Sequence, residues 1–480
     1  MLPAVRLSVR FLLTLGLLIG CASPAFAKQD ATKPDEVRLK AAYRFARGGW
    51  IYVHLEGSPA DIGYQHGYLL APEIEDGFKT VQLKDTHRTQ RDWSFYRATA
   101  QNILWPHIDV EYQQELQGIA DGLKAHGSTL DLWDIVALNA MEEVPDYYVP
   151  WLNKQEKQAH APDLKAPGNC SAFVATGAWT KDHKPVIAHS NWTDIATGTR
   201  WTVIFDIVPS NGYHMLMDGF PGIIVSDDDF GINAAGLMVT ETTIAGFALF
   251  DPNGKPEFVR ARKALQYSKS IDEYVQIMLD GNNGGYANDW LLADNNTGEV
   301  ARFEIGLKMH RVWRTKNGYF VGANFPSDPA FIKTETDFDP TNMSSSPNAR
   351  HKRWEELMPA NKGQIDVEMG EKFLADHFDT YEGKEDRNFR GLCGHGDTAP
   401  AGEPAWGEPA YSPMGAVTAQ AADSTMTRNM TLQARAGHPC GEDFIADKFL
   451  KEHPQFDWQR PILKDMKGNP WTEFKASDKQ

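Results

Sequence analysis

The chain has 480 residues, with 48 lysines and arginines against 64 aspartates and glutamates, and a formal net charge of −16. This balance excludes a nucleic-acid-binding protein, which needs a basic face for the phosphates, so no nucleic-acid partner is expected. The charged fraction of 23% and the hydrophobic fraction of 42% are those of an ordinary globular protein, and four cysteines are too few for a disulfide-stapled scaffold.

Residues 1–27 are typical of a signal peptide. Two arginines precede a short apolar run, and an Ala-Phe-Ala sequence closes it as a cleavage site. The run is too short to span a bilayer, and no later segment is long enough, so we expect a secreted or periplasmic protein without a transmembrane span. The alternative is a membrane-anchored lipoprotein, because Cys21 follows Leu-Ile-Gly as in a lipobox.

The hydrophobic periodicity from residue 28 to residue 149 is helical. Three helices are predicted there, from 59 to about 74, over 111–125 and over 128–143. Gly63 and Gly67 lie four residues apart on one face of the first helix, so another element can approach that face closely. The segment 152–168 is polar and lysine-rich, with two prolines and no aromatic residue, and it predicts an exposed linker.

Beyond residue 170 the pattern changes to short β-rich runs separated by turn residues, with a helical stretch at 258–279. Strands are expected at 171–176, 185–189, 201–208, 236–240, 290–293, 300–304 and 319–322. Because the strands are grouped rather than alternating with helices, the pattern favours a layered α+β fold over a parallel βαβ sheet.

Three cysteines remain beyond the leader. Cys393 and Cys440 both lie in glycine-rich, polar surroundings, so we expect a disulfide between them, which leaves Cys170 unpaired. Cys170 stands between the linker and a buried strand. If the bond from Asn169 to Cys170 is cut, the cysteine gains an α-amino group with an ordinary pKa of about 8, which suits a general base. The alternative is a buried structural cysteine.

Five short segments follow one another between residues 169 and 350. They are Asn-Cys-Ser-Ala at 169–172, Ala-His-Ser-Asn-Trp at 188–192, Glu-Thr-Thr at 241–243, Tyr-Ala-Asn-Asp-Trp at 286–290 and Ser-Pro-Asn-Ala-Arg at 346–350. In this order they resemble the phospholipase B-like proteins, a branch of the N-terminal nucleophile (Ntn) hydrolases. Near the N-terminus, Gly-x-x-x-Gly at 63–67 and Glu-Leu-x-Gly at 115–118 are similar to the autoproteolytic penicillin acyltransferase-like enzymes.

Both resemblances imply a four-layer αββα Ntn-hydrolase sandwich with an N-terminal helical segment. They imply cleavage into a chain of residues 28–169, ending in a processed linker at about 152–169, and a catalytic chain of residues 170–480. Cys170 would be the nucleophile, His189 would orient the amine or substrate, and Asn288 would donate to the oxyanion. By the same resemblance, the candidate pocket residues are Trp192, Asp194, Glu241, Trp290 and Arg350.

Each assignment has a structural alternative: a packed histidine, a turn asparagine, or a core-paired acid. Ala287, Asp289 and Asn348 depart from the family's pattern, which leaves substrate specificity open. No metal site is expected, since neither a CxxC pair nor an HExxH helix accompanies the histidines, and no cofactor is expected.

The resemblance implies an exported autoproteolytic hydrolase that releases acyl groups from phospholipid esters. An amidase or acyltransferase acting on N-acyl amides is the alternative within the same machinery, and a non-catalytic secreted binding protein is the alternative outside it. A papain-like protease is disfavoured, because its local cysteine signature is absent. The expected partner is a small acyl substrate, and the sequence does not address the oligomeric state.

Overall fold

The computed structural model describes residues 33–156, 164, 170–226 and 230–479. The expected leader with Cys21, the residue Asn169 and most of the expected linker lie outside the described residues. Within those ranges the strands form a nine-stranded sheet, a six-stranded sheet and a two-stranded ribbon. No helix among the described residues combines the length and hydrophobicity needed to cross a membrane.

The nine-stranded sheet is antiparallel except where β2 runs parallel to β5. Its order is β1 (Tyr43–Arg47), β2 (Trp50–Gly57), β5 (Val203–Pro209), β6 (Met215–Gly219), β7 (Gly231–Asn233), β8 (Leu237–Thr243), β9 (Asn288–Asp294), β10 (Glu299–Ile305) and β11 (His310–Thr315). The first two strands correct the expectation of purely helical structure before residue 149. Trp50 and Tyr52 alternate along β2 with the period of a strand, and Phe45 of β1 pairs with Tyr52 on the same buried face.

The six-stranded sheet contains the strand that follows Cys170. Its order is β12 (Gly318–Gly322), β3 (Ser171–Thr176), β4 (Val186–Asp194), β15 (Met414–Asp423), β16 (Thr431–Ala436) and β17 (Thr472–Lys475). The separate ribbon pairs β13 (Phe378–Asp379) with β14 (Lys384–Glu385). The strands expected from residue 171 onward are confirmed, with shifts of a few residues at their ends.

The two sheets pack face to face around a core of small, branched and aromatic side chains. Ala172 and Val174 of β3 are fully buried there, together with Leu291 and Ala293 of β9. Small residues on both inner faces let the sheets approach closely, as in other sheet sandwiches. Residues on the opposite faces of the same strands pack against helices, so the fold is an α+β sandwich of four layers.

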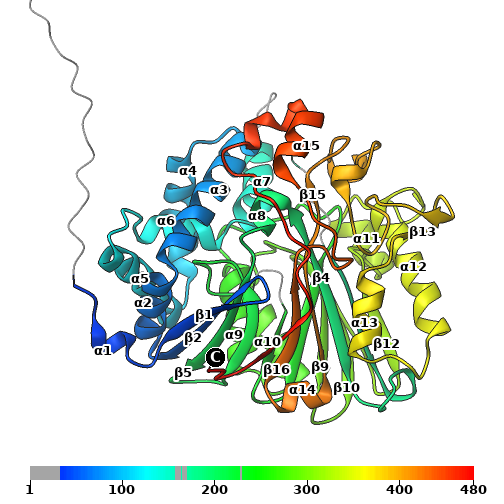
Figure 1. Ribbon diagram of the computed structural model, residues 1–480, viewed down its shortest axis with the longest axis horizontal. Helices are drawn as coiled ribbons and strands as arrows, with labels where there is room; N and C mark the ends of the chain where they lie inside the picture. The colour runs from blue at the N-terminus through cyan, green and yellow to red at the C-terminus, as the bar shows by residue number, and fades with distance from the viewer. Residues whose placement is uncertain (1–32, 157–163, 165–169, 227–229, 480) are drawn as a thin grey trace, which may run out of the picture.

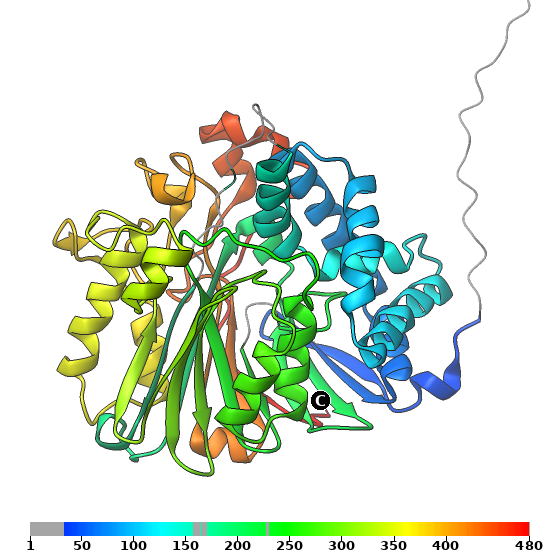
Figure 2. The same ribbon diagram turned by 180° about the vertical axis from the view of Figure 1, so that it is seen from behind.

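Helices cover both outer faces of the sandwich, with the N-terminal helices (blue to cyan) on one side and α12 and α13 (yellow) on the other, as Figure 1 and Figure 2 show from opposite sides. One apolar cluster joins the nine-stranded sheet to helical segments α2 (Pro59–Leu69), α3 (Ala71–Thr89), α4 (Trp93–Thr99), η1 (Ala100–Leu104), α5 (Val110–His126), α6 (Leu132–Asn139), η3 (Val144–Tyr148), α7 (Val149–Gln155), α9 (Glu257–Tyr267) and α10 (Ile271–Leu279). A second joins the six-stranded sheet to α12 (Ser346–Ala360) and α13 (Val367–Leu374).

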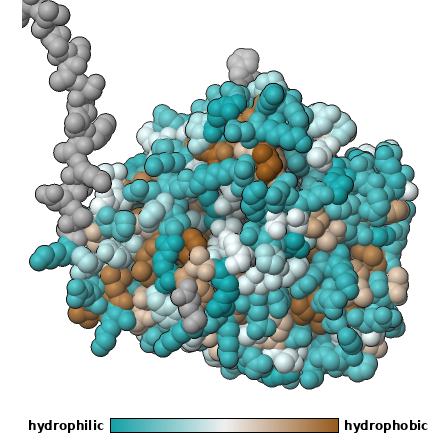
Figure 3. All heavy atoms as spheres, viewed as in Figure 1, coloured by the Kyte–Doolittle hydropathy of each residue, from teal (hydrophilic) through white to brown (hydrophobic). Residues whose placement is uncertain are grey.

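Short helical segments complete the chain. They are α1 (Glu36–Leu39), η2 (Trp105–His107), η4 (Gly177–Trp179), α8 (Ile195–Gly198), α11 (Pro329–Glu335), η5 (Gly396–Thr398), η6 (Pro404–Trp406), α14 (Ser424–Arg428), α15 (Ala446–Glu452) and η7 (Pro454–Gln459). The face drawn in Figure 3 is mostly hydrophilic, with hydrophobic side chains in separate small groups, as expected for a strongly charged chain.

The predicted glycine face of α2 is confirmed. A Cβ added at Gly63 or Gly67 would overlap backbone carbonyls of α5, and one added at Gly122 of α5 would overlap the backbone of α2. The two helices therefore cross at backbone distance, which only glycine permits.

Several predicted segments differ from the structure in extent. The helix expected from 59 to about 74 ends at Leu69, before α3 begins, and the helix expected over 128–143 is the shorter α6. The stretch expected over 258–279 is split into α9 and α10, because Ser270 caps a new helix by accepting from the Glu273 amide. The expected linker begins later than residue 152, because α7 continues to Gln155 and buries Asn153.

Candidate active site

Cys170 lies at the head of β3, directly after the undescribed residues 165–169. Its side chain is buried, with 1% of the residue exposed. Its φ angle is 85°, in the left-handed region that side chains other than glycine seldom adopt. Such strain costs on the order of 1–3 kcal/mol and concentrates at functional sites. The backbone at Cys170 is thus held in a conformation that needs support from its surroundings.

Three side chains that were predicted from separate sequence segments lie close together. The Cys170 sulfur, a ring nitrogen of His189 and a carboxylate oxygen of Glu241 all lie within 4.8 Å of one another. His189 comes from β4, beside β3, whereas Glu241 comes from β8 in the other sheet. The cluster therefore bridges the two sheets, and all three residues are buried.

The ring of His189 is oriented by a polar chain on the neighbouring strand. Its Nδ1 lies 3.3 Å from the side-chain oxygen of Gln420, whose amide nitrogen donates to Asp218. Because Asp218 fixes the Gln420 amide with its oxygen toward the ring, Nδ1 carries the proton in the neutral histidine. The Nε2 atom is then the nitrogen with a lone pair.

Glu241 is held by two donors. The Tyr286 hydroxyl donates to one carboxylate oxygen over 3.1 Å. In the amide orientation that satisfies its neighbours, Asn288 donates to the other oxygen over 2.8 Å and to the carbonyl of Ala287 over 3.0 Å. Asn288 therefore lies beside the cluster, with its amide engaged by Glu241.

Arg350 reaches the cysteine from α12, although it lies 180 residues along the chain. Its Nη1 donates to the carbonyl of Cys170 over 2.5 Å and to the Ser171 hydroxyl over 3.1 Å. Its Nη2 donates to Asn324 over 2.7 Å. Burial lowers the pKa of the guanidinium to about 9, although the nearby Cys170 and Glu403 favour its charge.

Asn324 is a site residue that the sequence did not point to. It adopts a left-handed φ of 62° and donates to the carbonyl of Thr243 at the end of β8. It thus links Arg350 to the strand that bears Glu241. The only sequence signal was an asparagine after a predicted strand, which is indistinguishable from an ordinary turn residue.

Trp192 lies under the arginine, whose guanidinium carbon is 4.3 Å from the centre of the indole ring. The ring is fully buried and also contacts Gly394, where a Cβ would overlap it. Asn348, at the position where the family has arginine, instead donates to loop carbonyls of Asp339 and Asn342. Arg350 and not Asn348 therefore contacts the cysteine.

Two other expected pocket residues make their side-chain contacts outside the cluster: Trp290, which stands opposite Glu241 in the pairing of β8 with β9, and Asp194. Trp290 packs against Tyr274 of α10, with ring centres 5.4 Å apart, so it belongs to the core under the helices. Asp194 caps α8 and lies 3.2 Å from Lys84. Burial disfavours its charge, yet Lys84 and the Thr197 donors hold the pKa of Asp194 below its ordinary value.

A cavity of about 390 Å³ opens beside Asp194. Its lining includes Lys84, Asp146, Trp458 and Ile462, so charged and apolar walls face one another. None of the cluster residues is among its lining residues. Asp194 is five residues beyond His189 on β4, which corresponds to roughly 16 Å at the usual rise of a strand.

Cys393 and Cys440 lie side by side and are not bonded to each other in this structure, and the expected disulfide stays a prediction. Their surroundings contain two histidines and are described below.

Comparison with known proteins identifies the chain's relatives. A family model described as Phospholipase B matches residues 74–313, which is half of the chain. The chain belongs to the phospholipase B family. The matched range includes Cys170, His189, Glu241 and Asn288, whereas Arg350 lies beyond it.

Individual phospholipase B relatives are distant. A protein named putative phospholipase B-like 3 from Caenorhabditis elegans is 28% identical over 205 residues, covering 40% of this chain and 34% of the relative. Phospholipase B-like protein C from Dictyostelium discoideum is 22% identical over 289 residues, covering 52% and 51%. Phospholipase B-like 1 from Bos taurus is 23% identical over 268 residues, covering 48% and 47%. The chain thus spans about a third to a half of these relatives' lengths.

Proposed function

We propose that this protein is an autoproteolytic Ntn hydrolase that cleaves acyl ester bonds of phospholipids with Cys170 as its nucleophile. One observation carries the proposal: the buried thiol at the head of β3 lies within 4.8 Å of both the His189 ring and the Glu241 carboxylate. A thiol beside a histidine and a carboxylate is the arrangement that activates a cysteine nucleophile. The phospholipid substrate rests on the family and on its relatives' names.

Maturation would begin with attack of the Cys170 sulfur on the carbonyl carbon of Asn169, while the thiol proton passes to Nε2 of His189. The peptide C–N bond breaks, a thioester forms, and the nitrogen takes that proton from His189 to become the α-amine of Cys170. Water then hydrolyses the thioester and leaves a carboxylate on Asn169 and a free thiol on Cys170. The left-handed φ of Cys170 supports this step, because cleavage releases the strain stored at that residue.

The mature site would use the same sulfur on the substrate ester. The thiol proton passes to the α-amine as the sulfur attacks the carbonyl carbon, and the alcohol leaves with a proton from the resulting ammonium. Water then attacks the thioester and regenerates the thiol as the fatty acid departs. The amine is suited to both transfers because its ordinary pKa is about 8.

The surrounding residues have separate tasks in this scheme. Glu241 is placed to hold the α-ammonium group, because its carboxylate is buried and directed at Cys170. Asn288 donates to the oxyanion once its amide turns from Glu241 toward the substrate. Arg350 fixes the carbonyl of Cys170, so it orients the nucleophile without touching the substrate carbonyl.

Processing divides the protein into residues 28–169 and 170–480, with export directed by the leader. An ester substrate is preferred to an N-acyl amide on the strength of the family alone. Both bond types fit the chemistry, so the test of the substrate is separate from the test of the nucleophile.

Denaturing electrophoresis and N-terminal sequencing of purified protein test the nucleophile. We expect two chains, the larger starting at Cys170, and a single chain in the Cys170→Ala variant. Processing that persists in Cys170→Ala would exclude Cys170 as its agent. His126→Ala, which changes an exposed histidine at the end of α5, is the control that should be processed normally.

A substrate panel tests the bond that is cleaved. Processed protein and the unprocessed Cys170→Ala variant are incubated with diacyl phospholipids and with N-acyl amino acids of equal chain length. Fatty acid release from the phospholipids by the processed protein alone supports the ester assignment. Release only from the amides would replace the phospholipase activity with an amidase.

A further inference from the structure

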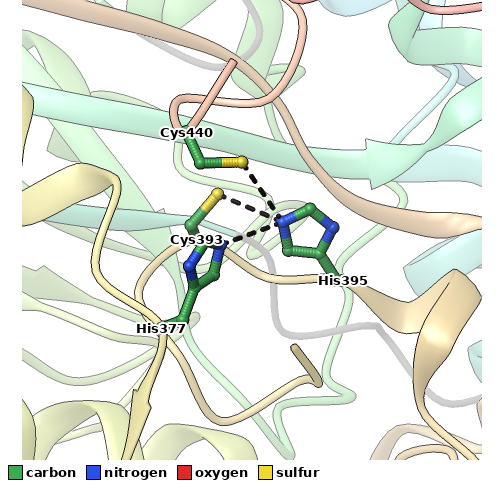
Figure 4. A group of neighbouring side chains, drawn as sticks. All are labelled: His377, Cys393, His395 and Cys440. Atoms are coloured by element: carbon green, nitrogen blue, oxygen red, sulfur yellow. Dashed lines mark hydrogen bonds between the residues drawn. The ribbon is translucent and has the colours of Figure 1, made fainter. Parts of the chain in front are cut away.

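A second group of cysteine and histidine side chains lies outside the proposed active site. Cys393, Cys440, His377 and His395 converge so that one ligating atom of each lies within 4.8 Å of all the others (Figure 4). They come from three loops: His377 between α13 and β13, Cys393 and His395 ahead of η5, and Cys440 after β16. Cys393 and His395 are buried, and the other two are half-buried.

The distances within the group are those of a metal's ligand shell. The Nε2 atoms of His377 and His395 are 3.2 Å apart, and each sulfur is 3.5 Å from His395 Nε2. Around a tetrahedral Zn²⁺, with bonds of about 2.0–2.1 Å to nitrogen and about 2.3 Å to sulfur, neighbouring nitrogens stand about 3.3 Å apart and nitrogen and sulfur about 3.6 Å apart. All three measured separations fall within about 0.1 Å of these values.

Hydrogen bonds alone do not account for this convergence. The Nε2 atom of His395 has three close partners, yet an imidazole nitrogen offers either one hydrogen or one lone pair. At most one of the three contacts can therefore be a good hydrogen bond. A cation at the centre instead satisfies every lone pair at once, with both thiols deprotonated and their protons released to solvent.

A carboxylate stands behind one of the ligands, as is usual for metal-bound histidine. Asp397 Oδ1 lies 3.9 Å from Nδ1 of His395, the ring nitrogen that faces away from the sulfurs. Among the described residues this oxygen has no hydrogen-bond partner, although it is buried. A shift of about 1 Å would let Nδ1–H donate to it, which would fix the ring with Nε2 free for a metal.

We propose that Cys393, Cys440, His377 and His395 form a Zn²⁺ site that ties the three loops together. The two thiolates and two imidazoles select Zn²⁺ over the harder Mg²⁺ and Ca²⁺, which prefer oxygen ligands. All four positions are protein side chains, which is typical of a structural rather than a catalytic zinc.

The site lies close enough to brace the nucleophile. Gly394, between two of the ligands, packs on the ring of Trp192 without room for a Cβ. The same ring also contacts the Arg350 guanidinium, which holds the carbonyl of Cys170. Bound zinc would thus hold Gly394 in place and, through Trp192 and Arg350, would support the backbone of Cys170 at the head of β3.

Metal analysis of the full chain, produced without a polyhistidine tag and purified without chelator, tests the proposal. We expect about one zinc per chain in the unaltered protein. Cys440→Ser and His377→Ala should each lose most of the zinc. Cys170→Ser and His126→Ala, which alter the same residue types elsewhere, should retain it. Because zinc content is measured independently of processing, failure of the proposed active site would leave this result unchanged.

The competing outcome is a disulfide between Cys393 and Cys440. Intact mass under denaturing, non-reducing conditions would then be about two mass units lower, and zinc would be absent; that result overturns the proposal. Because a ligand variant can fail to fold, cobalt is also exchanged into the unaltered protein. Visible bands of tetrahedral Co²⁺ with thiolate charge transfer support the site, whereas an octahedral spectrum or no binding by folded protein refutes it.

Discussion

Among the residues that the structure describes, two clusters combine cysteine with histidine, and they differ in their surroundings. At the head of β3 one thiol meets one imidazole and one carboxylate, and the cysteine backbone has a left-handed φ of 85°. At the loop cluster two thiols and two imidazoles meet with tetrahedral spacings. The same residue types therefore suit two different chemistries.

The difference lies in what surrounds each sulfur. Around Cys170 the neighbours are an imidazole, a carboxylate and an arginine on the backbone carbonyl, a set that suits the proposed nucleophile. Around Cys393 and Cys440 the neighbours are further metal ligands, which would occupy both sulfurs.

Removing the Cys170 sulfur should have the largest effect of the changes considered, and that effect should be confined to the proposed active site. Cys170→Ala is expected to abolish processing and to lower ester hydrolysis by a factor on the order of 10⁴ or more, since the nucleophile is lost. Fatty acid release measured against phospholipid vesicles gives the activity. Zinc content should not change, and its loss in this variant would mean that the clusters are not independent.

Removing a sulfur from the loop cluster should act on stability first. Cys440→Ser is expected to lower the free energy of unfolding by about 3–4 kcal/mol in zinc at 100–1,000 times its dissociation constant, because the bound metal no longer favours the folded state. Thermal unfolding with and without a chelator gives the value. Chelator should lower the Tm of the unaltered protein toward that of Cys440→Ser and leave the variant's Tm unmoved.

The arginine that holds Cys170 should affect maturation without removing the nucleophile. Arg350→Lys leaves a charge but loses the planar donors to Cys170 and Asn324, at a cost of about 1–3 kcal/mol per buried group left unpaired. We expect processing to slow by about 10- to 100-fold, since 1.4 kcal/mol corresponds to a factor of ten. A time course of the precursor band measures it. Arg353→Lys, on the same helix but paired with Asp376, is the matched control and should process at the normal rate.

The smallest effect is expected at the contact between the clusters. Gly394→Ala would press a methyl group against Trp192, and overpacking of this kind typically costs about 1–3 kcal/mol. We expect a modest fall in Tm together with a several-fold slower appearance of the chain that starts at Cys170. A fall in Tm with an unchanged rate of processing would show that the contact stabilises the fold without bracing the nucleophile.

The sequence predicts structural features correctly where residues close together in the chain determine them. The start of α2 at Ser58 and the glycine face that packs on α5 follow from capping and from the absence of side chains, so they were predicted correctly. The strand after Cys170 was equally clear. By contrast, the hydrophobic periodicity predicts a helical region where β1 and β2 lie. The flanking helices contribute most of the pattern, and the alternating run between them is short.

The candidate site divides in the same way. Cys170, His189 and Glu241 were proposed from short segments, and the fold brings them together. Asn324 was missed, since only a left-handed backbone and a distant arginine give it a role. The sequence did not point to the loop cluster as a set, because His377, Cys393 and Cys440 are too far apart in sequence to form a spacing motif. Such groups depend on loop packing, which local patterns do not encode.

The parallel pairing of β2 with β5 bears on what the proposed cut at Cys170 would leave behind. β2 precedes that bond and β5 follows it, so the two products would share one sheet, with seven residue pairs in register from Ile51 with Val203 to Gly57 with Pro209. They would remain a single particle after cleavage. Once denatured, however, they would have to find each other by diffusion, so recovery on dilution should rise with protein concentration. The uncut Cys170→Ala chain should refold at a rate independent of protein concentration. Cleavage would thus turn one chain that refolds by itself into two chains whose refolding depends on their meeting.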